Sequence, residues 1–221
     1  MDVYRTADKR ILELLTGIIK RLNRYKGQIN TKSDTLAIFD ELHVLYKQID
    51  RESRNTFLEI LQNAYDAESE TKRRRFDEAF INIMLDDEPN EFTGVIYGRE
   101  LERRAERFAE RIVSALNRSL QQEQRTDQEG AVIPLGTEIK AIFDQEYSGL
   151  SLLLDQYGIV FVDEGRVAAF ADDSVSSVMW ITQIDGRECR YCKSLNRHVF
   201  RADKVPTKPH PRCRCYTIRF K

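Results

Sequence analysis

The fold class is decided by the stretch Ile11-Leu12-Glu13-Leu14-Leu15-Thr16-Gly17-Ile18-Ile19-Lys20-Arg21-Leu22. Its apolar residues recur three or four positions apart, at Ile11, Leu14, Leu15, Ile18, Ile19 and Leu22. That spacing places them on one face of an α-helix and leaves the opposite face to polar side chains. We therefore predict an amphipathic helix that buries one face against other helices.

The same periodicity continues over much of the first 156 residues. A second helix begins near Ser33 or Asp34, either of which can cap it, and its apolar stripe holds Leu36, Phe39, His43, Tyr46 and Ile49. A further stripe over 57–65 either continues this helix or follows a break near Ser53. We predict three more helices, over residues 72–85, about 98–124, and 137 to about 156.

Length and composition exclude two broad classes of protein. With 41% hydrophobic and 32% charged residues, the 221-residue chain is too apolar for a disordered protein and too charged for a membrane protein. No apolar run reaches the roughly 20 residues that a membrane span needs, and the N-terminus lacks the layout of a signal peptide. We therefore expect a protein that folds in the cytoplasm and has no membrane span.

The net charge of −1 is the balance of two unequal parts of the chain. Eleven Lys and Arg residues lie in 187–221, where only Glu188 and Asp203 oppose them, so this tail carries a net charge of +9. The first 186 residues therefore carry a net charge of −10. A basic tail predicts an acidic partner, either nucleic acid or an acidic protein surface.

The C-terminal part of the chain has the pattern of short β-strands. A β-branched and aromatic run that ends before the turn Asp185-Gly186 contains Val175, Val178, Trp180 and Ile181. At the end of the chain, polar residues alternate with Tyr216, Ile218 and Phe220. We therefore predict a mainly α protein with a small β-rich C-terminal module, α+β overall.

All four cysteines of the chain lie in this module. Cys189 and Cys192 are three residues apart, and seventeen residues separate them from the run His210-Pro211-Arg212-Cys213-Arg214-Cys215. Two ligand pairs separated by roughly 15–20 residues are typical of a structural zinc site. The favoured ligands are Cys189, Cys192, His210 and Cys213, with Cys215 as the alternative to Cys213 and an all-cysteine site as a third option. Four protein ligands leave no open position for chemistry, so the expected role of zinc is to fold the module.

The spacing is also compatible with two disulfides or with uncoordinated thiols. A reducing cytoplasm keeps thiols free, which favours zinc over the disulfides.

The same residues carry a resemblance to a known family. The run from Trp180 to Asn196, followed by Val199-Phe200 and by 209–215 with its closing His-Pro-x-Cys-Arg-Cys element, resembles the signature of the phage minor head protein, or head morphogenesis, family (Mu F-like). Asn196-Arg197 stand where the family usually has a small residue or glycine. The resemblance covers residues 100–216 and is specific from about residue 178.

The resemblance implies a structural minor capsid protein of a tailed phage or prophage that acts in head assembly near the portal. Together with the helical periodicity and the cysteine spacing, it predicts a helical body over 1–125 and a head-morphogenesis-like domain over 137–221, with the zinc-binding module at about 178–221. The implied location is the inside of the virion head, after assembly in the host cytoplasm. The implied partners are the portal protein, other head proteins and packaged double-stranded DNA, which the protein could accompany on ejection.

The basic tail supports a second reading, a nucleic-acid-binding zinc module with a regulatory or packaging role. The expected residues of nucleic-acid or portal contact are Arg187, Arg190, Lys193, Arg197, Arg212 and Arg214. Because the chain has no glycine-rich phosphate loop and no nucleophile elbow, we expect neither an enzyme nor a small-molecule substrate.

Overall fold

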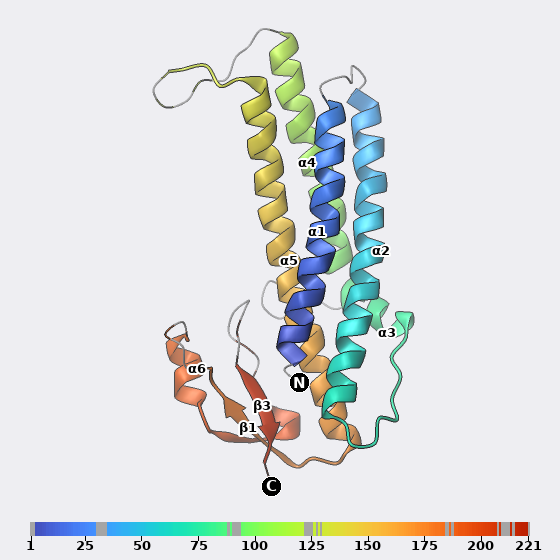
Figure 1. The fold of residues 1–221 in the computed structure, drawn as a ribbon, viewed down its shortest axis with the longest axis vertical. Helices are drawn as coiled ribbons and strands as arrows, with labels where there is room; N and C mark the ends of the chain where they lie inside the picture. The colour runs from blue at the N-terminus through green and yellow to red at the C-terminus, as the bar shows by residue number, and fades with distance from the viewer. Residues whose placement is uncertain are drawn as a thin grey trace.

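The computed structural model describes residues 3–29, 35–87, 89, 94–121, 126, 128, 130–183, 186, 188–206, 208, 213 and 215–220. Within these residues four long helices lie side by side as an elongated bundle (Figure 1). They are α1 (Val3–Ile29), α2 (Thr35–Glu68), α4 (Tyr97–Leu120) and α5 (Leu135–Asp172). The prediction of a mainly helical protein with a small C-terminal sheet is confirmed.

The apolar stripes of the helices form the core of the bundle. In α1 the predicted stripe is buried, apart from the half-buried Ile19. Aromatic rings from three helices meet in the middle of the bundle. Phe57 of α2 stacks on Phe161 of α5, with ring centroids 5.0 Å apart, and Tyr97 of α4 meets Tyr157 of α5 edge-on at 4.9 Å. Such pairs stabilise a core beyond the area that they bury.

Helix α2 is continuous, and its buried face differs from the predicted stripe. Leu36 and His43 are exposed, whereas Ile38 and Leu42 are buried in their place. The helix continues through Ser53, whose hydroxyl donates a hydrogen bond of 2.6 Å to the Ile49 carbonyl one turn earlier. Burial of this hydroxyl therefore leaves no polar group unpaired.

The helix predicted over 72–85 is wrong in its first half. Residues 72–77 are not helical, and α3 (Glu78–Asn82) begins only after Asp77, whose side chain accepts the Phe80 N–H. A π-helical turn, η1 (Ile83–Asp87), follows. The backbone of the preceding segment is held on α2 instead, because the Arg74 N–H donates to the Tyr65 hydroxyl and the Phe76 N–H donates to the Gln62 side chain. These tertiary contacts outweigh the local helical periodicity.

Helix α5 continues far beyond the predicted end near residue 156. Two glycines let it approach its neighbours closely. A Cβ at Gly158 would lie 3.0 Å from the Ile11 side chain of α1, and one at Gly165 would lie 2.4 Å from the Leu61 carbonyl of α2. The glycines therefore belong to helix contacts and do not end the helix.

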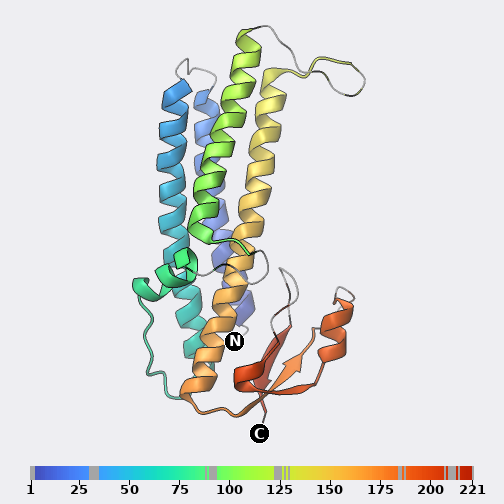
Figure 2. The same cartoon turned by 180° about the vertical axis from the view of Figure 1, so that it is seen from behind.

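A three-stranded antiparallel sheet lies at one end of the bundle (Figures 1 and 2). Its strands are β1 (Ser177–Ile181), β2 (Val199–Arg201) and β3 (Tyr216–Arg219), in the order β2-β1-β3. The short helix α6 (Arg190–Leu195) links β1 to β2, and the 3-10 turn η2 (Ala202–Lys204) follows β2. We call the unit of β1, α6, β2, η2 and β3 the Cys module.

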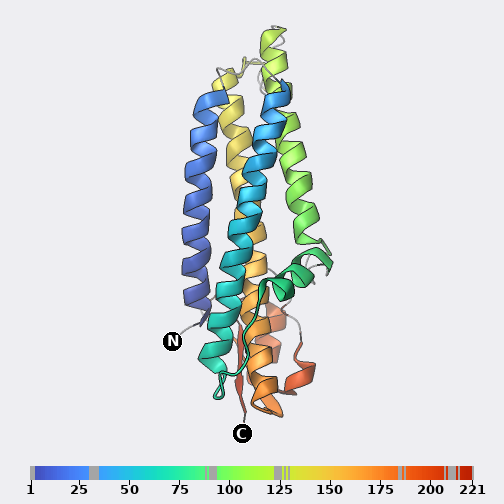
Figure 3. The same cartoon turned by 90° about the vertical axis from the view of Figure 1, so that its right-hand side faces the viewer.

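The Cys module sits beside the end of α5 and the start of α1, and both chain ends lie at this end of the bundle (Figure 3). The connection between α4 and α5 separates 1–125 from 137–221. Helix α5 nevertheless packs along α1, α2 and α4 before it leads into β1. None of the helices in the described part of the chain combines the length and the apolar character that a membrane span requires.

We predict that Gly165→Ala lowers the free energy of unfolding by about 2–3 kcal/mol, because the added methyl group meets backbone atoms of α2 that cannot move aside. Gly27→Ala in α1 is the matched control. A Cβ there meets nothing within 4 Å, so this change should raise stability by up to about 1 kcal/mol. Urea unfolding followed by circular dichroism measures both, and equal effects would contradict the close contact at Gly165.

Candidate metal centre

Three buried cysteines cluster in the Cys module. Cys192 lies in the first turn of α6, whereas Cys213 and Cys215 come directly before β3. Their three sulfur atoms lie within 4.8 Å of one another, and the Cys192 and Cys213 sulfurs are 3.5 Å apart. Elements distant in sequence therefore bring three thiols to one point.

The core of the Cys module is built around this cluster. Trp180 of β1 is 1% exposed and packs with the cysteines, and the surrounding half-buried side chains are Cys189, Leu195, Phe200 and Val205. Thr182 holds α6 on the sheet, because its hydroxyl donates a 2.6 Å hydrogen bond to the Cys192 carbonyl. So few apolar residues form a small core, and the thiols are a large part of it.

Cys189 lies next to the cluster but outside the group of three. It is the N-cap residue of α6, and its sulfur accepts the backbone N–H of Cys192 at 3.3 Å. Its side chain is half-buried, so it is the most accessible of the four thiols. The i, i+3 spacing places it on the same side of the helical turn as Cys192.

All four cysteines belong to the described residues, and none of them forms a disulfide. The 3.5 Å between the Cys192 and Cys213 sulfurs is well beyond the bond length of about 2.05 Å. Burial raises the pKa of both thiols, so in the absence of a cation they are neutral at pH 7. A bound metal ion would displace these protons.

The donor set fits a thiophilic metal ion. Tetrahedral zinc with Zn–S bonds of about 2.3 Å needs sulfurs about 3.8 Å apart. The Cys192 and Cys213 sulfurs, 3.5 Å apart, are close to this separation, and the Cys215 sulfur lies within 4.8 Å of both. Burial beside Trp180 excludes water from the cluster, which suits a closed structural site rather than an open catalytic one.

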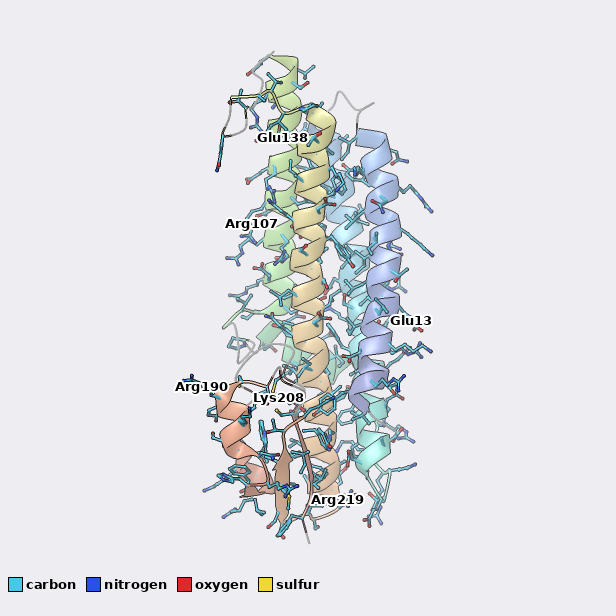
Figure 4. All side chains as sticks on the ribbon, turned by 60° about the vertical axis from the view of Figure 1, so that its left-hand side comes forward. Glu13, Arg107, Glu138, Arg190, Lys208 and Arg219 are labelled. Carbon is cyan, nitrogen blue, oxygen red and sulfur yellow. The ribbon has the colours of Figure 1, made fainter. Side chains whose placement is uncertain are left out.

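Other predicted site residues lie on the surface or outside the described residues. Arg190, Lys193 and Arg197 are exposed, and Lys193 pairs with Glu188 at 2.8 Å. Figure 4 shows Arg190 pointing outward from α6. The predicted residues outside the described part of the chain are Arg187, His210, Arg212 and Arg214.

Sequence reasoning missed the residues that hold the Cys module on the bundle. Arg166 of α5 is 4% exposed, pairs with Glu68 of α2 at 3.0 Å and donates to the Thr217 carbonyl of β3. Its guanidinium carbon lies 5.5–5.9 Å from the ring centroids of Tyr4, Phe170 and Tyr216. A cation inside the apolar 158–170 segment is the one sequence signal that could have indicated this role.

Two cations of the Cys module complete this interface. Lys208 is 6% exposed, and its ammonium lies 2.9 Å from Asp163 and 3.0 Å from the Tyr4 hydroxyl. Arg219 of β3 pairs with the buried Asp173 and with Glu70. Figure 4 labels both cations where the module meets the bundle. Acidic groups of the bundle thus neutralise basic groups of the module.

No protein family, no curated protein and no solved structure matches the chain. The resemblance of the C-terminal residues to phage minor head proteins therefore stays a prediction.

We predict that Arg166→Met lowers the free energy of unfolding by about 2–4 kcal/mol, because it leaves Glu68 and the Thr217 carbonyl without their partner. Arg201→Met is the control, since Arg201 pairs with Asp203 on the surface and should contribute less than about 1 kcal/mol. Urea unfolding followed through the fluorescence of Trp180 compares the two. Similar losses in both variants would contradict a docking role for Arg166.

A pH dependence follows from Asp173. Burial raises the pKa of its carboxyl, but hydrogen bonds from Arg219 and from the Glu70 and Thr71 backbone outweigh burial and lower the pKa to about 2. An unfolded aspartate titrates near pH 4, so the stabilisation is complete above about pH 4 and is lost as the pH falls towards 2.

Acid titration of stability, measured on both proteins with the Cys module folded at neutral pH, should therefore be flatter between about pH 4 and 2 for Asp173→Asn than for wild type. Chemical denaturation at stepped pH measures this difference. Parallel curves for the two proteins would show that Asp173 is not paired in solution.

Proposed function

We propose that the chain is a structural minor head protein of a tailed phage or prophage that acts in head assembly near the portal. In this proposal, the Cys module folds around a structural zinc ion, and the helical bundle carries the module. The protein has no catalytic role, and its partners are the portal protein and other head proteins.

The observation that carries the proposal is the position of the residues that resemble the family signature. Those that the structure describes belong to one small unit, with Trp180 in β1, Cys189 and Cys192 at the start of α6, and Cys213 and Cys215 before β3. Residues far apart in the signature therefore share one core. A signature whose residues meet at one point is expected for a folded module.

The turn after α6 gives further support. Arg197 has a φ of 64°, in the left-handed region that favours glycine. This is the place where the family usually has a small residue or glycine. The backbone is held there, because the Arg197 N–H donates to the Trp180 carbonyl at 2.7 Å. The backbone of this turn thus has the conformation for which a glycine, as usual in the family, is best suited.

Zinc is the metal that we propose because the donors are thiols in a closed, buried group. The ion would cross-link α6 to the segment before β3. A module with so few apolar residues gains much of its folding free energy from such a link. Zinc here would supply structure and no chemistry.

We predict that metal removal unfolds the Cys module and leaves the bundle folded. Trp180 is the single tryptophan of the chain, and it is buried in the module, so its fluorescence should shift to the red when a chelator is added. Far-UV circular dichroism should keep most of its helical signal, and zinc should reverse the change. Reduced protein that lacks zinc by mass spectrometry and still buries Trp180 would contradict the prediction.

The assembly role is tested by co-expression with the portal protein of the same phage. Wild type should co-purify with the portal and appear in procapsids or virions. Cys213→Ser, which removes a buried thiol of the cluster, should lose this association, whereas Arg201→Met on the surface should keep it. Absence of the wild-type protein from both procapsids and virions would overturn the role.

A second candidate, nucleic-acid binding, is favoured by the exposed cations of the Cys module. Arg190, Arg197 and Lys204 are exposed and form no salt bridge within the described part of the chain. Binding through such residues should weaken steeply as salt rises, because counterions are released from the phosphates. Lack of binding to duplex DNA at about 50 mM salt, or binding that salt does not change, would remove this candidate.

A further inference from the structure

We infer that the metal centre is an all-cysteine site in which Cys189 joins Cys192, Cys213 and Cys215, so that His210 is not a ligand. This inference rests on the proposed zinc-binding role of the Cys module. It assigns the fourth position and with it the charge and the metal preference of the site.

The first step concerns Cys213 and Cys215. Residues two apart in an extended segment point to the same side, and the sulfurs of both residues lie within 4.8 Å of the Cys192 sulfur. The choice between them therefore disappears, because both belong to the cluster. Three of the four positions of a tetrahedral site are filled by cysteine.

The second step concerns Cys189. Its position at the N-cap of α6 directs its sulfur back over the first turn, where the sulfur accepts the Cys192 N–H at 3.3 Å. The side chain packs against the same cluster as Trp180 and the three buried cysteines. Cys189 is therefore the thiol next to the cluster that is placed to take the fourth position.

The two halves of the site share a hydrogen-bonding pattern. The Cys192 N–H donates to the Cys189 sulfur, and the Cys215 backbone hydrogen-bonds the Cys213 sulfur. Backbone N–H groups aimed at sulfur stabilise a thiolate, because a hydrogen bond to a charged acceptor is stronger than one to a neutral acceptor. The Cys189 sulfur thus accepts a backbone hydrogen bond in the same way as a sulfur inside the cluster. Such a bond is expected for a metal ligand, whereas a thiol that binds no metal does not need it.

Charge is the third step. Four thiolates around a divalent cation leave a net charge of −2, which is costly to bury unless cations lie nearby. Lys208, which also pairs with Asp163, is a buried cation close enough for its charge to act on Cys213. An all-sulfur site also selects thiophilic ions such as Zn²⁺, Cd²⁺ and Co²⁺ over Mg²⁺ and Ca²⁺.

The test uses the full chain, reduced and metal-free, and titrates it with Co²⁺ and then with Zn²⁺. The variants are Cys189→Ser and, as the matched comparison, His210→Ala. Wild type and His210→Ala should show the same sulfur-to-cobalt charge-transfer intensity. Cys189→Ser should lose about a quarter of this charge-transfer intensity. Its zinc affinity should fall by more than the about 10–100-fold that the loss of an outer-shell partner costs.

X-ray absorption of the wild-type zinc protein counts sulfur neighbours directly and stays informative if Cys189→Ser does not fold. Four sulfurs support the inference. Three sulfurs and one nitrogen, or loss of intensity in His210→Ala with none in Cys189→Ser, would overturn it and leave the zinc module in place. Failure of wild type to bind either ion would instead overturn the proposed zinc role itself.

Discussion

The burial of the Arg166 guanidinium is the constraint on which the placement of the Cys module depends. A buried cation is costly unless a counter-ion and hydrogen-bond acceptors replace water. Glu68 of α2, the Tyr4 hydroxyl of α1 and the Thr217 carbonyl of β3 do so, and each comes from a different element. Because all three must be present at once, one side chain fixes how the two helices and the sheet meet.

Strand β3 connects this interface to the cysteine cluster. Cys215, directly before the strand, supplies a clustered sulfur, Thr217 accepts from Arg166, and Arg219 pairs with Asp173. These three residues are every second residue in a stretch of five. The same short segment therefore both completes the cysteine cluster and attaches the module to the bundle. It does the first through a thiol and the second through a carbonyl and a guanidinium group.

The sequence was sufficient for the features that depend on periodicity and spacing. The stripe from Ile11 to Leu22 predicts α1, and the cysteine spacing predicts the clustering of thiols at the C-terminus. The extended segment before α3 and the full length of α5 were missed, because hydrogen bonds to Tyr65 and a close approach at Gly165 decide them. Arg166 was missed for the same reason, since its partners come from distant parts of the chain. The fourth metal ligand stays a proposal.

The continuity of α5 has a consequence for how the molecule could bridge its neighbours. A helix of 38 residues spans about 57 Å, and α5 carries the Cys module at one end and the connection to α4 at the other (Figure 1). Three further helices brace it along much of its length. Two partners bound at its opposite ends would therefore be kept apart by about the length of this one helix.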